Sequence, residues 1–117
     1  MLDTILSALL LTVFIEGCVL LFIRERRWRV LLGSVVINIC TNVPLSIWAI
    51  STWPGWGEII VAELIIFAVE TAAYFALVRN LRQAAAYSGL CNSISFLAGL
   101  LIELICIIFN IDTPLLY

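Results

Sequence analysis

The sequence contains no histidine and no lysine, and all six of its basic residues are arginines. Without histidine the chain has no histidine-based acid–base catalysis, no Ser-His-Asp triad and no histidine ligand for zinc or haem. It also has no glycine-rich phosphate-binding loop. We therefore expect no enzyme, no catalytic residue and no metal centre.

Charged residues are scarce as well, at 12% of the chain, whereas 64% of the residues are hydrophobic and the mean hydropathy is +1.18. A soluble domain of this size cannot bury so much apolar surface, so the expected partner is the lipid bilayer. Six arginines in a chain of net charge −2 do not favour binding to nucleic acid. The four cysteines form no Cys-x-x-Cys pair, which argues against a disulfide framework or a zinc site.

Four apolar segments are each long enough for a helix that crosses a hydrocarbon core of about 30 Å, which takes about 20 residues. They lack the polar–apolar alternation of barrel strands, so helices are favoured. The segments run roughly over Thr4–Ile23, Val30–Ile50, Ile59–Val78 and Ala84–Phe109. The sequence predicts an all-α fold, a four-transmembrane-helix bundle that forms a single domain over residues 1–117.

The arginines occupy only the first and third connections between these segments: Arg24, Arg26, Arg27, Arg29, Arg79 and Arg82. Cytoplasmic loops of membrane proteins are enriched in basic residues. We therefore expect both arginine loops in the cytoplasm and both termini outside, in a bacterial-type inner membrane. Trp53 and Trp56, in and beside the central connection, fit the aromatic belt of the outer interface.

Two polar pairs repeat along the chain. Glu16 and Asn38 are twenty-two residues apart, and Glu70 and Asn92 have the same separation fifty-four residues later. The arginine positions place all four at a similar depth, about 12–15 Å from the inner loops. The chain is therefore read as two tandem helical hairpins in a parallel pseudo-repeat, about 1–54 and about 55–110.

Further polar residues follow the same helix faces. Residues three and four positions apart lie on one face of a helix, and intramembrane polar groups face the bundle interior. We expect these residues to support the polar layer: Ser34, Thr41, Asn42, Tyr74, Ser88 and Ser95. Glu63 and Glu103, nearer the outer side, are candidates for an access path.

The carboxyl groups have no basic partner within the predicted spans. A charge at the centre of a membrane helix costs on the order of 3 kcal/mol. Each glutamate must therefore be protonated, be hydrogen-bonded by amides and hydroxyls, or bind a cation. The candidates for binding an ion or carrying a proton are Glu16, Asn38, Glu70 and Asn92, and no cofactor beyond a proton or monovalent cation is expected.

Two other features bear on assembly and mechanism. Pro44 predicts a break in the second helix, because proline removes a backbone hydrogen bond and crowds the preceding turn. Ala68, Ala72 and Ala76 form a ridge of small residues on the side of the third helix opposite Glu70. Such ridges allow close approach of another helix, which indicates a homo-oligomer or a larger membrane-protein partner.

Two functions fit this pattern. The first is proton- or cation-linked transport by an oligomer, with the glutamate–asparagine layer on the transport path. The alternative is a non-catalytic membrane subunit or scaffold of a larger complex, in which the polar layer fixes the register of the helices. A transporter needs a carboxyl group that titrates, whereas a register-fixing glutamate should tolerate replacement by glutamine.

Overall fold

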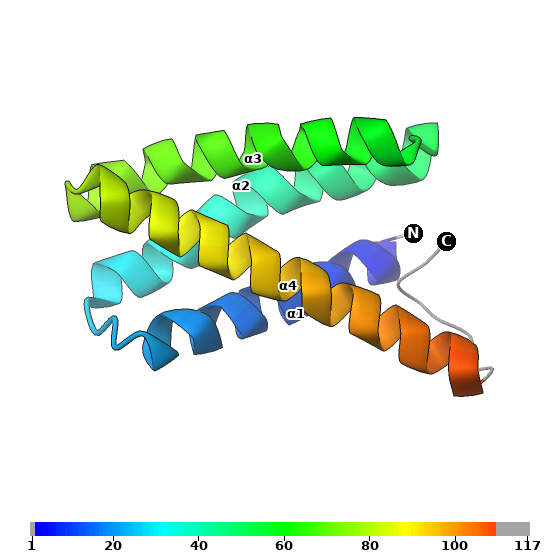
Figure 1. The fold of residues 1–117 in the computed structure, drawn as a ribbon, viewed down its shortest axis with the longest axis horizontal. Helices are drawn as coiled ribbons and strands as arrows, with labels where there is room; N and C mark the ends of the chain where they lie inside the picture. Colours follow the sequence, from blue (N-terminus) through cyan, green and yellow to red (C-terminus); the bar gives the residue numbers. More distant parts are fainter. Residues whose placement is uncertain (1, 110–117) are drawn as a thin grey trace.

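A computed structural model describes residues 2–109, which form four helices in one bundle (Figure 1). The helices are α1 (Leu2–Phe22), α2 (Trp28–Thr52), α3 (Trp56–Val78) and α4 (Leu81–Phe109). No strand occurs among the described residues, and all four helices are long and apolar enough to cross a membrane. The all-α prediction with four such helices is confirmed. Residue 110, the predicted end of the second hairpin, lies outside the described residues.

Local capping interactions define the helix ends. The side chain of Glu58 accepts a hydrogen bond of 2.9 Å from the backbone N–H of Gly55 and so caps the start of α3. The side chain of Asn80 accepts a bond of 3.0 Å from the N–H of Gln83 at the start of α4. Trp53 adopts a left-handed conformation after α2, and its N–H bonds to the carbonyl of Ala49. The connections between consecutive helices are short, so consecutive helices are antiparallel.

The helices follow one another around the bundle, and α1 also packs against α4. Figure 1 shows the α1–α2 and α3–α4 connections at one end, which we call the arginine end because all six arginines lie in or beside these connections. The α2–α3 connection lies at the other end, here called the tryptophan end after Trp53 and Trp56. Glutamates on alternate helices can therefore meet near the bundle axis.

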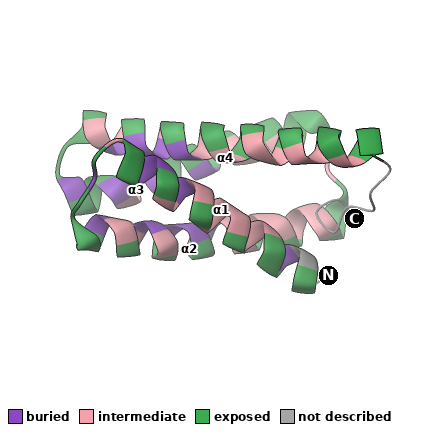
Figure 2. Ribbon diagram, turned by 90° about the horizontal axis from the view of Figure 1, so that it is seen from below, coloured by how far each residue is buried: buried purple, intermediate pink, exposed green. Residues whose placement is uncertain are grey.

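The two ends are packed differently. The hydrophobic core lies towards the arginine end, where Leu20, Val30, Tyr74 and Cys91 are at most 1% exposed. Beyond Thr41 on α2 and beyond Cys91 on α4, the described residues are not fully buried. Figure 2 shows the same gradient, with the buried residues gathered towards one end of the bundle. The bundle is closed at the arginine end and looser at the tryptophan end.

In contrast to the predicted break, α2 continues through Pro44 from Trp28 to Thr52. Proline removes only one helical hydrogen bond, and the turns on either side can hold the helix together. The side chain of Pro44 is exposed on the bundle surface, so its ring is not forced into the packed interior. The helix therefore does not supply an unwound segment to the polar layer.

Candidate functional site: a carboxyl–amide network below a vestibule

The first polar pair forms a direct contact between α1 and α2. The side-chain amide of Asn38 donates a hydrogen bond to Oε2 of Glu16, and it also donates to the backbone carbonyl of Ser34 at 3.0 Å. Both hydrogens of the amide are therefore engaged. Glu16 and Asn38 have no exposed surface, and Ser34 is only 3% exposed.

The second pair repeats these contacts between α3 and α4. The side-chain amide of Asn92 donates to Oε2 of Glu70 and, at 2.9 Å, to the backbone carbonyl of Ser88. The Ser88 hydroxyl lies 3.3 Å from the same carboxyl oxygen and 3.2 Å from the carbonyl of Phe67. Glu70 and Ser88 have no exposed surface. In each hairpin an asparagine thus donates both to a glutamate on the preceding helix and to a backbone carbonyl on the helix of the asparagine.

Side chains of α2 join the two pairs into one network. The amide of Asn42 donates to Oδ1 of Asn38 at 2.7 Å, and it lies 3.4 Å from the hydroxyl of Thr41. That hydroxyl is 2.8 Å from Oε1 of Glu70 and 2.9 Å from the carbonyl of Ile37. A continuous hydrogen-bonded path therefore runs from Glu16 to Glu70 through α2.

Two buried oxygen atoms of this layer have no hydrogen-bond partner among the described residues: Oε1 of Glu16 and the hydroxyl of Tyr74. Tyr74 is 1% exposed, and the side chains of Ser34 and Cys91 lie close to its hydroxyl. Glu16 also interacts electrostatically with Glu70. The layer thus contains two carboxyl groups, no basic side chain and spare acceptor capacity at Glu16.

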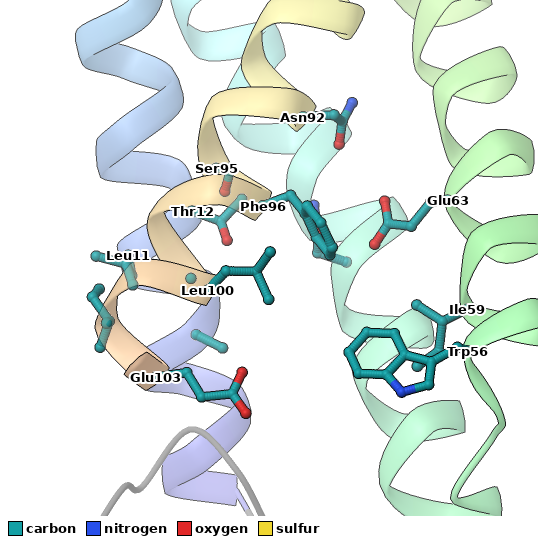
Figure 3. A pocket seen from close by; sticks show the side chains of 14 residues that line it. Leu11, Thr12, Trp56, Ile59, Glu63, Asn92, Ser95, Phe96, Leu100 and Glu103 are labelled. Atoms are coloured by element: carbon teal, nitrogen blue, oxygen red, sulfur yellow. The ribbon is translucent and has the colours of Figure 1, made fainter. Parts of the chain in front are cut away.

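A cavity of about 300 Å³ extends from this network towards the tryptophan end, and we call it the vestibule. Residues of all four helices line it, and its polar lining consists of Thr12, Asn42, Glu63, Asn92, Ser95 and Glu103. Figure 3 shows the carboxyl groups of Glu63 and Glu103 directed into the space between α3 and α4. The two candidates for an access path therefore lie in one cavity, and Asn42 and Asn92 belong to both the vestibule and the network.

The remaining predicted residues lie elsewhere. Ala68, Ala72 and Ala76 are exposed on α3, whereas Glu70 and Tyr74 of the same helix are buried.

Among the described residues no group of three or more histidine, cysteine, aspartate or glutamate side chains is placed to hold a metal ion. The arrangement thus offers oxygen atoms of carboxyl, amide and hydroxyl groups as hydrogen-bonding groups.

Sequence reasoning missed a third buried carboxyl group, which lies at the arginine end. Glu25 is 4% exposed and accepts three hydrogen bonds from Arg27: 2.8 Å from the backbone N–H, 3.0 Å from Nε and 2.7 Å from Nη2. The hydroxyl of Tyr87 donates a fourth at 2.5 Å and accepts one from Gln83. The Arg27 bonds, with a smaller contribution from Tyr87, lower the pKa of Glu25 to about 2. This cluster, Glu25–Arg27–Tyr87, ties the α1–α2 connection to α4.

The comparisons with known proteins add no relative: no protein-family model, no curated protein and no solved structure matches this chain.

Proposed function

We propose that the protein is a small polytopic membrane transporter, driven by or carrying protons or monovalent cations, that works as an oligomer. The observation that carries this proposal is the junction between the vestibule and the network, because Asn42 and Asn92 belong to both. A species entering the vestibule can reach the hydrogen-bonded path between Glu16 and Glu70 without crossing packed apolar side chains. The packed arginine end then forms the barrier that a transport cycle must open.

The chain is proposed to lie in a bacterial-type inner membrane with the arginine end in the cytoplasm and the tryptophan end outside. A cysteine introduced at Gly55, in a background without native cysteines, should react with an impermeant maleimide on intact spheroplasts. A cysteine at Asn80 should react only after the membrane is permeabilised. The reverse pattern would overturn the orientation and with it the assignment of the vestibule to the outer side.

A tandem pseudo-repeat is part of the proposal. It is supported by equivalent contacts in the two hairpins, since Asn38 and Asn92 each donate to a glutamate on the preceding helix and to a serine carbonyl four residues earlier. Such an arrangement brings two carboxyl groups to one level. Two carboxyl groups at one level can pass a proton between them through the bridging side chains.

The hydrogen bonds of Thr41 support a role for this hydroxyl as the partner of Glu70 in the proposed proton transfer. A hydroxyl donates one hydrogen bond, yet Thr41 lies within bonding distance of two acceptors, the carbonyl of Ile37 and Oε1 of Glu70. Both contacts are satisfied when Glu70 is protonated and donates to Thr41, which in turn donates to Ile37. When Glu70 is ionised, Thr41 must turn and donate to the carboxylate. Rotation of one hydroxyl therefore accommodates both states.

The test is cation-driven proton flux in proteoliposomes that contain an interior pH dye. Glutamine at position 70 can keep the acceptor towards Asn92 and donate to Thr41, so Glu70→Gln mimics the protonated side chain without losing the fold. We expect flux in the wild type and its loss in Glu70→Gln, with Asp3→Asn, an exposed carboxyl group on α1, as the control that retains flux. Absence of flux in the wild type, or unchanged flux in Glu70→Gln, would refute the proposal.

The second candidate function is a non-catalytic subunit or scaffold of a larger membrane complex. It is favoured by the nearly complete internal bonding of Glu70 and by the exposed ridge of Ala68, Ala72 and Ala76. In this case Glu70→Gln leaves assembly unchanged, whereas Ala72→Leu prevents close helix approach. Cross-linking and size measurements of these two variants in nanodiscs separate this function from transport.

A further inference from the structure

The vestibule contains groups that the carboxyl–amide network does not use. Glu63 and Glu103 are half-buried on α3 and α4, and neither makes a hydrogen bond or an ion pair with another described residue. Both line the same cavity of about 300 Å³ (Figure 3). That volume lies at the lower end of the range for small-molecule pockets, about 300–1,000 Å³.

The charges around the vestibule select a cation. Two carboxyl groups line it, a third belongs to Glu70 below it, and no arginine contributes to its lining. All six arginines of the chain lie at the arginine end. In a cavity with apolar walls this arrangement attracts a positive charge and repels an anion.

The rest of the lining selects an organic cation over an inorganic one. Trp56 and Phe96 present aromatic rings to the cavity, and Leu11 and Leu100 add aliphatic surface (Figure 3). Aromatic rings bind alkylated ammonium groups through their negative faces, whereas a hydrated inorganic ion gains little from such walls. An adjoining cavity of about 360 Å³ between α3 and α4 shares Trp56 and Phe96 and adds further apolar surface.

From the joint presence of unpaired carboxyl groups and aromatic walls we infer that the vestibule binds a compact alkylammonium cation. The ammonium group lies between Glu63 and Glu103, and its alkyl or aryl substituents lie against Trp56 and Phe96. The inference deepens the proposed function and rests on it, since it names the class of species that enters the transport path from the tryptophan end. Release of this cation and protonation of Glu70 would be linked through Asn92, which contacts the vestibule and Glu70.

Binding is measured by isothermal titration calorimetry on the full chain in nanodiscs at one fixed pH. Because no ion gradient exists across a nanodisc, the result does not depend on transport. The probes are choline, benzyltrimethylammonium, sodium ion and 3,3-dimethylbutan-1-ol, the uncharged carbon analogue of choline. We expect saturable binding of both ammonium ions, tighter for benzyltrimethylammonium, and at least about tenfold weaker binding of the uncharged analogue. This comparison uses only the wild type and does not depend on the folding of any variant.

Variants then locate the site. Glu63→Gln and Glu103→Gln should each weaken binding of benzyltrimethylammonium by about tenfold, Trp56→Leu should weaken it less, and Asp3→Asn should leave it unchanged. Equal binding of choline and its uncharged analogue, displacement of choline by an equal concentration of sodium, or unchanged binding in both glutamine variants would overturn the inference. Cation binding without proton flux would refute the proposed transport but not the inferred alkylammonium ligand. Proton flux without cation binding would refute the inferred ligand but not the proposed transport.

Discussion

The cluster Glu25–Arg27–Tyr87 allows a stability prediction that does not depend on transport. The pKa of Glu25 is lowered from 4.5 to about 2, and the side-chain hydrogen bond from Arg27 is the largest cause. The carboxyl group of Glu25 therefore binds a proton less tightly in the folded protein than in the unfolded chain. The stabilisation that the ionised Glu25 gives to the folded protein is complete above about pH 4.5. It is lost as the pH falls from about 4.5 to about 2.

The size of the effect follows from the same shift. A difference of about 2.5 pH units corresponds to at most about 3.4 kcal/mol. Arg27 is half exposed to solvent, which screens its interaction with the carboxylate, so we expect about 1–2 kcal/mol at neutral pH. Glu25→Gln should lose this amount, and Tyr87→Phe about 1 kcal/mol, because one hydrogen bond to a charged group is removed.

The assay is unfolding of the detergent-solubilised protein by sodium dodecyl sulfate, followed by near-ultraviolet circular dichroism. The rings of Tyr74 and Tyr87 pack edge to face with their centroids 5.9 Å apart, so the aromatic signal reports the loss of packing at any pH. The stability difference between the wild type and Glu25→Gln should be constant near neutral pH and shrink as the pH falls below 4.5. A difference that is absent at pH 7, or does not change down to pH 3, would refute the reasoning.

Two further predictions use the same assay. Thr41→Val should cost about 1–3 kcal/mol, because it leaves Oε1 of Glu70 buried without its partner, whereas Thr41→Ser should restore most of the loss. Gly17→Ala should stabilise α1 by about 0.5–1 kcal/mol, since its Cβ meets nothing within 4 Å. Gly33→Ala should gain less, because its Cβ would lie 2.5 Å from Cδ1 of Leu77, and an equal or larger gain would contradict the packing argument.

The helices could be predicted because their signal is local. Length and apolarity of each segment decide whether it can span a membrane, and the segments found agree with those expected to within a few residues. The contacts of Asn38 with Glu16 and of Asn92 with Glu70 also follow from a local rule. Equal depth on two helices joined by a short connection brings their side chains together. Their functional role stays a prediction.

Packing between distant segments could not be predicted. Glu25 stands among arginines in the sequence, a context typical of a solvated loop, yet the left-handed turn at Arg24 and the distant Tyr87 bury it. The vestibule likewise depends on how far α1 and α4 separate from α2 and α3. The break predicted at Pro44 does not occur, because α2 tolerates the loss of one backbone hydrogen bond.

The two central glutamates each accept a hydrogen bond from an asparagine but differ in their other contacts, and this difference can be measured. Both oxygens of Glu70 have partners, whereas Oε1 of Glu16 has none among the described residues. In Glu70→Gln the new NH₂ group can donate to Thr41, but in Glu16→Gln it would replace Oε1, which has no hydrogen-bond partner among the described residues. Glu16→Gln should therefore destabilise the bundle by about 1 kcal/mol more than Glu70→Gln in the same unfolding assay. Equal losses would mean that Glu16 is bonded as fully as Glu70, and a proton or cation would then have no free oxygen atom to bind at this level of the bundle.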